Sequence, residues 1–279
     1  MYVDKSILTE AISAITGVTV KLKSDCKDLD GAIQLHIVNL PSLSLLNNEA
    51  RLVEPDSLLA SHMWGLRIHD RWDWDTIEET PMRETSRSSL RKQLFVISDD
   101  FFDPAYDFDF TNMSELDDDS GCMRGGEPYM RPYGWMRFAL KVRNKYPDGN
   151  AWLGTGGWRN RSAPGEWPVS YHGTDLKGAE GIIQSHYKAG DREAYGRGIY
   201  SSPDINVADG YATTKKFTSQ NNGKTYKVIM QNRINPQKRE ITIKKNFWLV
   251  PIPKGTSAEK EREIVESTIR PYGLLLKEV

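Results

Sequence analysis

From residue 134 to the C-terminus, the chain consists of short apolar runs separated by turn residues, and this pattern restricts the fold strongly. The runs predict strands at 134–142, 167–171, 224–234, 247–250 and 274–279, with one more that ends at 200. Stretches between them predict short helices at 178–185, 204–213 and 256–269. Asp204 can cap the second helix, and Thr256 with Glu259 matches a capping box for the third. Strands broken by short helices predict an α+β fold with split, mostly antiparallel sheets.

The first 119 residues have a different composition and apolar pattern, and they predict a mixed α/β region of unknown role. A helix and two strands are expected there, at 7–15, 31–40 and 94–98. A polar stretch rich in Trp at 47–91 separates them.

An acid-rich stretch at 99–119, followed by several glycines, predicts a loop or linker. Its carboxylates lack the spacing of a calcium-binding loop, so no metal is expected. We therefore divide the chain into an N-terminal region at 1–119 and a second domain at 120–279.

Charge is distributed unevenly along the chain. Residues 1–130 contain 12 Lys and Arg against 24 Asp and Glu, whereas residues 131–279 contain 25 against 14. The basic half suits an anionic ligand such as a dinucleotide, although both halves could equally be ordinary solvated surfaces.

Several bulk features predict an intracellular protein, cytoplasmic or nuclear, that is not in a membrane. The mean hydropathy is −0.57. No apolar run approaches the roughly 20 residues of a spanning helix, and the N-terminus lacks a secretory segment. Cys26 and Cys122 lie far apart and are expected to be free thiols, although a single disulfide between them stays open.

Two motifs, whose His172 and Tyr200 are 28 positions apart, contain the residues best suited to chemistry. The first is Tyr171-His172-Gly173-Thr174. The second is Gly196-Arg197-Gly198-Ile199-Tyr200, and Tyr211 follows it by eleven residues. A His on one strand, a Tyr on another and a second Tyr on the next helix could hold a flat aromatic ligand between two rings.

In this order and spacing, the motifs resemble those of the poly(ADP-ribose) polymerase and diphtheria-toxin type of ADP-ribosyltransferase, over residues 129–279. The resemblance implies that NAD is a co-substrate. It implies that the Gly173 N–H and C=O bind the nicotinamide carboxamide, beside Thr174, and that Tyr200 and Tyr211 enclose the ring. His172 is expected to donate to a ribose hydroxyl.

The sequence departs from the family pattern at two positions. Ala208 stands where the family has a Ser that binds the carboxamide, and Asn206 could replace that contact. Asn246 stands where the family has a Glu that reaches the ribose, although Glu240 or Glu266 could fill this role instead. Members of the family without that Glu do not build polymers, so transfer of a single ADP-ribose is expected.

Other functions and simpler readings stay open at this point. The domain could bind NAD or ADP-ribose without turnover. Nine Lys and Arg with one acid at 215–245 leave a nucleic-acid acceptor open, although a protein acceptor is preferred. Glu259, Glu261 and Glu263 predict a solvated helix face, and the glycines at 154–157 predict a turn.

Overall fold

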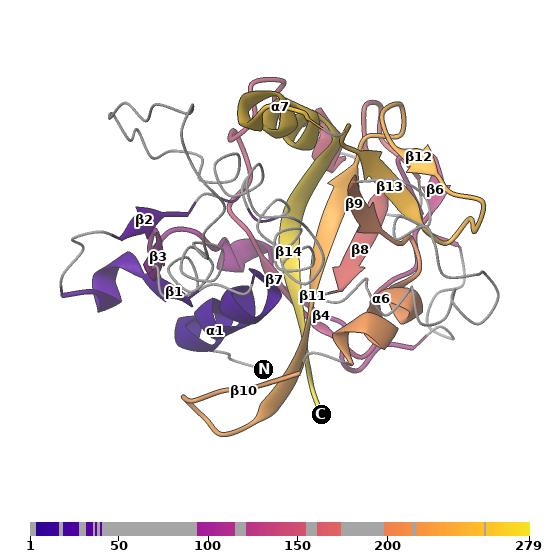
Figure 1. The fold of residues 1–279 in the computed structure, drawn as a ribbon. Helices are drawn as coiled ribbons and strands as arrows, with labels where there is room; N and C mark the ends of the chain where they lie inside the picture. The colour runs from indigo at the N-terminus through magenta and orange to yellow at the C-terminus, as the bar shows by residue number, and fades with distance from the viewer. Residues whose placement is uncertain are drawn as a thin grey trace, which may run out of the picture.

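The computed structural model describes residues 4–16, 19–27, 32–35, 37, 40, 94–114, 121–154, 161–173, 198–213, 216–253 and 255–279. These residues form a mixed α+β fold with mostly antiparallel sheets, as predicted (Figure 1). The predicted helix at 178–185 lies outside the described residues, as do Thr174, Gly196 and Arg197.

A six-stranded antiparallel sheet forms the centre of the fold. Its main path runs in the order β10 (Phe217–Thr218), β11 (Thr225–Ile234), β14 (Ile269–Glu278), β7 (Met136–Ala139) and β4 (Phe108–Asp109). The sixth strand, β8 (Val169–Gly173), also pairs with β11. Alternate residues of β11 face opposite sides of the sheet, and two separate hydrophobic clusters cover those sides.

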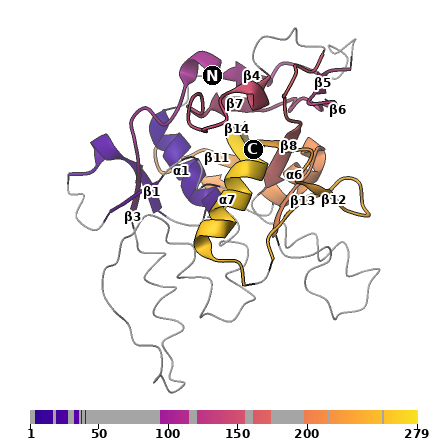
Figure 2. The same ribbon diagram turned by 90° about the horizontal axis from the view of Figure 1, so that it is seen from above.

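One side of the central sheet packs against the N-terminal helix α1 (Lys5–Thr16). The cluster there joins Ile12 and Ile15 of the helix to Val228 and Leu276 of the sheet. Next to α1 lies a three-stranded parallel sheet in the order β1 (Thr19–Leu22), β3 (Leu94–Ile97) and β2 (Ile33–Gln34) (Figure 2). The predicted strand at 31–40 is therefore only two residues long.

The acid-rich stretch is more structured than the sequence predicts. It contains a short 3-10 helix η3 (Pro104–Tyr106) and β4, which pairs with β7 as the edge of the central sheet. Apolar residues before and after position 119 also share one hydrophobic cluster. The expected boundary after residue 119 therefore does not coincide with a break in the core.

A second antiparallel sheet has the order β12 (Glu240–Ile241), β13 (Trp248–Pro251) and β9 (Gly198–Ser201). Helix α7 (Ala258–Thr268) packs against it through Val265, which clusters with Ile199 and Val250. Smaller elements are the hairpin β5 (Met123–Arg124) and β6 (Glu127–Pro128), and the 3-10 helices η1 (Lys23–Asp25) and η5 (Ala151–Leu153).

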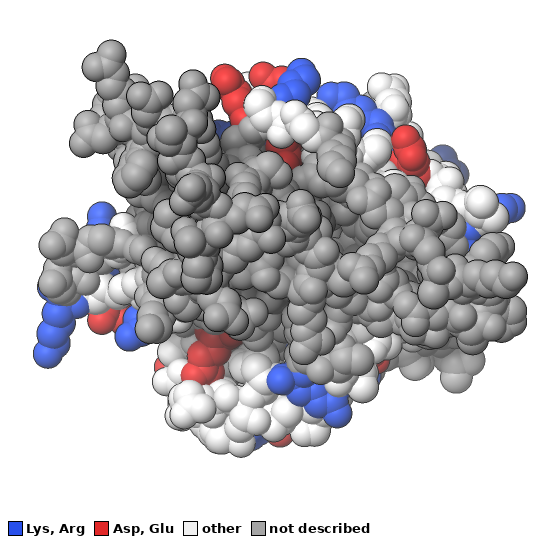
Figure 3. Space-filling model, in the orientation of Figure 1, with Lys and Arg blue, Asp and Glu red and all other residues white. Residues whose placement is uncertain are grey.

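Helix α7 corrects two predictions. Its N-cap is Ser257, whose hydroxyl accepts from the Lys260 amide, whereas the Thr256 hydroxyl donates to the Pro253 carbonyl. Charged side chains of both signs lie over α7 at the top of Figure 3. Glu259 and Glu263 are exposed as predicted, but Glu261 is fully buried. The predicted solvated face is therefore wrong at that position.

Candidate functional site

The two sequence motifs meet where β8 and β9 lie side by side. Tyr171 and Ser202 form an antiparallel bridge, in which each amide donates to the other residue's carbonyl, at 2.7 and 2.9 Å. On its other edge, β8 pairs with β11, so that His172 lies opposite Met230. Both motifs therefore belong to one continuous layer of strands.

A hydrogen bond joins His172 to the second motif. The Nδ1 atom of His172 lies 2.7 Å from the main-chain oxygen of Tyr200. Because a carbonyl oxygen can only accept, Nδ1 is the protonated nitrogen in this contact. The pKa of His172 is lowered, mainly because burial penalises the imidazolium, and the bond to Tyr200 offsets part of that effect.

A neutral ring with its proton on Nδ1 has an acceptor at Nε2. The sequence predicts that His172 donates to a ribose hydroxyl. In this tautomer Nε2 carries no proton, so it cannot act as the expected donor.

The main-chain groups of Gly173 lie on the edge of β8 that faces β9. In an antiparallel strand, the amide and carbonyl of one residue point to the same edge, and alternate residues share that edge. Tyr171 directs both groups toward β9, so Gly173 directs its own N–H and C=O to that side as well. One donor and one acceptor in this arrangement match the two polar groups of a carboxamide.

Helix α6 (Ile205–Ala212) lies directly on Gly173, on the side where a Cβ would stand. A Cβ at this position would be 2.5 Å from the Ala208 carbonyl oxygen and 3.0 Å from the Tyr211 Cβ. The first separation is shorter than real Cβ contacts and the second is unusually tight, so packing alone favours glycine here. The same packing fixes Tyr211 next to Gly173. The helix begins as predicted, because the Asp204 carboxylate accepts from the Asn206 amide.

Tyr200 approaches the same region from β9. Tyr171 and Ser202 are bridge partners and share one face of the layer, and Tyr200 shares it too because it lies two residues from Ser202. Ala208 of α6 packs with Tyr171 on that face. The structure thus brings Gly173, Tyr200 and Tyr211 to the α6 side of the layer, with Tyr200 partly exposed and Tyr211 buried. The His172 side chain belongs to the opposite face, because it follows Tyr171 in the strand, and it contacts the main-chain oxygen of Tyr200.

Asn206 does not join this group. Its side chain is exposed, and its amide nitrogen lies 3.7 Å from the Met130 sulfur. Positions 206 and 208 lie about 200° apart around a helix, so Asn206 and Ala208 face different sides. Ala208 itself lies against Gly173 without a polar side-chain atom.

The three candidates for the third catalytic position have very different surroundings. Asn246 is exposed in the turn between β12 and β13. Glu266 lies on α7, where its carboxylate accepts from Arg262 at 2.5 Å. Glu240 lies opposite Leu249, which lies opposite Tyr200, so the side chains of Glu240 and Tyr200 share a face of the second sheet. Of the three candidates, Glu240 is thus the one that the strand register places on the same face as Tyr200, with Leu249 between them.

A segment that the sequence did not mark lies beside the site. The Tyr171 hydroxyl donates to the Met130 carbonyl at 2.5 Å, and the Gln231 amide lies 3.2 Å from the Tyr129 hydroxyl. Burial raises the pKa of Tyr171 well above its ordinary value, so the hydroxyl keeps its proton. Nothing in the local pattern around 129–130 indicates these contacts, because both partners are distant in sequence.

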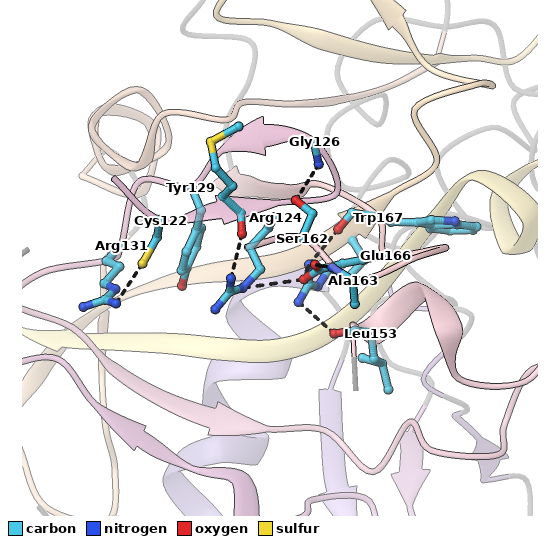
Figure 4. A network of polar contacts seen from close by, with 12 residues as sticks. Cys122, Arg124, Gly126, Tyr129, Arg131, Leu153, Ser162, Ala163, Glu166 and Trp167 are labelled. Carbon is cyan, nitrogen blue, oxygen red and sulfur yellow. Dashed lines mark hydrogen bonds and ion pairs between the residues drawn. The ribbon is translucent and has the colours of Figure 1, made fainter. Parts of the chain in front are cut away.

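A buried ion-pair network anchors this segment to the central sheet (Figure 4). The Glu166 carboxylate lies between two guanidinium groups, 2.9 Å from Arg233 and 3.5 Å from Arg124. Arg131 lies 2.8 Å from the Cys122 sulfur. Cys26 and Cys122 are free thiols, as predicted.

Comparisons with known proteins identify no family for this chain. No protein-family model matches it, and no curated protein matches it significantly. In the part of the chain that the structure describes, no helix has the length and apolar character needed to span a membrane.

Proposed function

We propose that residues 120–279 form an ADP-ribosyltransferase-like domain that binds NAD, releases nicotinamide and transfers a single ADP-ribose to a macromolecule. The observation that carries this proposal is that Gly173, Tyr200 and Tyr211 lie together at the junction of β8, β9 and α6, with His172 bonded to the Tyr200 main chain. The two motifs that resemble the family, together with Tyr211, supply these four residues.

In the proposed complex, the carboxamide pairs with the main chain of Gly173, and the nicotinamide ring lies between Tyr200 and Tyr211. The ring is cationic in NAD, and contact with an aromatic face contributes about 0.5–2 kcal/mol. The His172 Nε2 accepts from a ribose hydroxyl. Cleavage of the nicotinamide–ribose bond builds positive charge on the ribose, so a rigid site that orients the sugar lowers the barrier.

A carboxylate near that charge would help most, and Glu240 is better placed for this than Glu266 by the strand register. It is exposed and lies in register with Tyr200 across one intervening strand. Asn246 would supply only a dipole. A single well-placed electrostatic group can contribute roughly 3–4 kcal/mol to the barrier. We therefore assign Glu240 ahead of Asn246 and Glu266 as the third catalytic residue.

A second candidate function is an NAD-binding or ADP-ribose-binding module without turnover. Two observations favour it. Ala208 offers no hydroxyl next to Gly173, and the Asn246 side chain is exposed in a turn. In either case we prefer a protein acceptor or partner over a nucleic acid, because the basic stretch at 215–245 is the single feature that favours the latter.

One experiment separates the two functions. The protein is incubated with NAD carrying one label on nicotinamide and another on adenine, and a candidate protein mixture serves as acceptor. An enzyme releases free nicotinamide and leaves one adenine label per modified site. A binding module retains intact NAD in a titration and releases no nicotinamide. Absence of both binding and release would refute both functions.

A further inference from the structure

An exposed apolar pair marks strand β12 and the turn that follows it. Among the residues that the structure describes, Ile241 is 55% exposed and Ile243 is 92% exposed. Figure 2 shows this turn projecting from the side of the molecule. Single exposed apolar residues are common on protein surfaces, but two in one turn form a patch that can bind a partner.

The turn is held in one shape by its own hydrogen bonds. The Thr242 amide donates to the Phe247 carbonyl at 3.0 Å, and the Phe247 amide donates to the Lys244 carbonyl at 2.9 Å. The Thr242 hydroxyl donates to the same Lys244 carbonyl at 2.8 Å. Just before β12, the Arg239 guanidinium lies 3.5 Å from the centre of the Trp248 ring. A surface that is ordered before binding loses less conformational entropy when a partner docks.

The outer edge of β12 is open. This strand is the last of the second sheet, and in the described part of the chain no strand pairs with its far side (Figure 1). The main chain of Thr242 faces β13, because its amide bonds there, so the neighbouring Ile241 directs its N–H and C=O away from β13. Lipid offers nothing to pair with such groups, whereas an extended peptide pairs with both. The edge therefore suits a protein segment better than a membrane surface.

The charge around the apolar pair is positive. Lys238, Lys244 and Lys245 are all exposed. Glu240 is the nearest acid in the sequence, and it lies on the other face of β12 because it neighbours Ile241. Two copies of this edge would repel each other, since their lysines would meet. The lysines therefore favour a partner with acidic side chains.

We propose that an extended, acidic segment of a partner protein adds to the edge of β12 as a further strand. Its main chain pairs with Ile241, and its apolar side chains cover Ile241 and Ile243. Its acidic side chains meet the three lysines. This docking surface does not depend on the proposed function, because no contact with NAD enters the argument. Peptide binding by a protein that binds no NAD would leave the docking surface in place and remove the proposed function.

Peptide binding to the whole protein tests the proposal. The probe is a fluorescent peptide in which Val and Glu alternate, and its counterpart carries Lys in place of each Glu. Fluorescence anisotropy should show roughly tenfold or tighter preference for the acidic peptide, and added NaCl should weaken its binding. Methylation of alternate peptide amides should abolish binding, because it removes the donors to the strand edge. Binding of neither peptide, or unchanged binding after methylation, would overturn the proposal.

Variants at exposed positions locate the site. Ile243→Asp should weaken binding of the acidic peptide roughly tenfold or more, because it removes an apolar contact and adds a repelling charge. Since the Ile243 side chain is 92% exposed, this substitution should leave the fold intact. Val279→Asp is the matched control, because Val279 is 52% exposed and follows β14 in the other sheet. Equal losses in the two variants would contradict the assignment to β12.

Competition experiments separate a protein partner from other anionic partners. Vesicles that contain phosphatidylserine, or a single-stranded oligonucleotide, are added to the complex with the acidic peptide. Neither should displace the peptide at equal salt. Displacement by vesicles that fails with Ile243→Asp would identify a membrane-binding turn instead. Displacement by the oligonucleotide would identify a nucleic-acid surface, and either result would overturn the proposal.

Discussion

The Nδ1 atom of His172 lies 2.7 Å from the carbonyl oxygen of Tyr200, and this contact joins two motifs through residues 28 positions apart. It gives His172 a structural role in addition to any role toward a ligand. The two roles use different nitrogens of the ring, so they can be separated by substitution.

His172→Asn should preserve the structural role and abolish the ligand role. The Asn amide nitrogen can replace Nδ1 as a donor to Tyr200, but Asn has no counterpart of Nε2. We expect His172→Ala to lose about 1–3 kcal/mol of stability and His172→Asn to lose less, with NAD turnover strongly reduced in both. Thermal unfolding and nicotinamide release measure the two effects. Full turnover by a folded Asn variant would remove His172 from the site.

Gly173→Ala should displace α6 and with it Tyr211. The added Cβ would stand 2.5 Å from the Ala208 oxygen, a contact that the structure cannot accommodate without a shift. We expect a loss of about 1–3 kcal/mol in the free energy of unfolding and weaker NAD binding. Gly210→Ala is the control, since nothing lies within 4 Å of its added Cβ. It should stabilise the helix by about 0.5–1 kcal/mol. Equal effects at both positions would contradict the packing argument.

Stability should fall in mild acid because of His172. Its pKa in the folded protein lies below the ordinary value of 6.5, so the unfolded chain binds more protons between the two values. The contribution of His172 to the free energy of unfolding is fully present above about pH 6.5. It declines as the pH falls toward the pKa of His172 in the folded protein. Urea midpoints at several pH values should show a steeper decline for the native protein than for His172→Asn. If the urea midpoints of the native protein and of His172→Asn decline equally as the pH falls, His172 does not titrate in this way.

The third catalytic position is tested by paired substitutions. Glu240→Gln should lower the rate of nicotinamide release and leave NAD affinity nearly unchanged, because the carboxylate acts on charge that develops in the transition state. Glu266→Gln is the control and should have little effect on the rate. Asn246→Glu should raise the rate if position 246 reaches the ribose. A large loss in Glu266→Gln with none in Glu240→Gln would reverse the assignment.

Arg270 should be a major determinant of stability. Its guanidinium lies 4.0 Å from the Tyr146 ring centre and 4.4 Å from that of Trp167, and its side chain is only 5% exposed. Arg270→Ala removes these stacking contacts and leaves a cavity, so we expect a loss of about 3 kcal/mol or more. Arg262→Ala removes an exposed helical ion pair and should cost about 0.3–0.5 kcal/mol. Denaturant unfolding of both variants measures the difference, and similar losses would contradict the account.

Local patterns predicted the strands and helix α6 well, because their apolar periodicity and the cap at Asp204 are contained in short segments. The local patterns gave a wrong prediction where two neighbouring residues could both serve as the cap of a helix. Thr256 and Ser257 can both cap, and the extended backbone of Ser257 decides between them. Strand β14 begins at Ile269 rather than at 274. Pro271 disfavours a helical conformation at Arg270, and this signal was available in the sequence.

The site was predictable only in part, since its parts come together through non-local pairing. The motifs identified His172, Gly173, Tyr200 and Tyr211, and the structure pairs His172 with the Tyr200 main chain and Gly173 with Tyr211. The register of β12, β13 and β9, which relates Glu240 to Tyr200, depends on strand pairs distant in sequence.

The most direct test of the central claim is a crystal structure of the protein with NAD or nicotinamide bound. The account predicts the carboxamide within hydrogen-bonding distance of both the N–H and the C=O of Gly173. It also predicts the ring between the side chains of Tyr200 and Tyr211, with centroid separations of about 4.5–7 Å. A ligand bound elsewhere, or a ring that contacts neither tyrosine, would contradict the account.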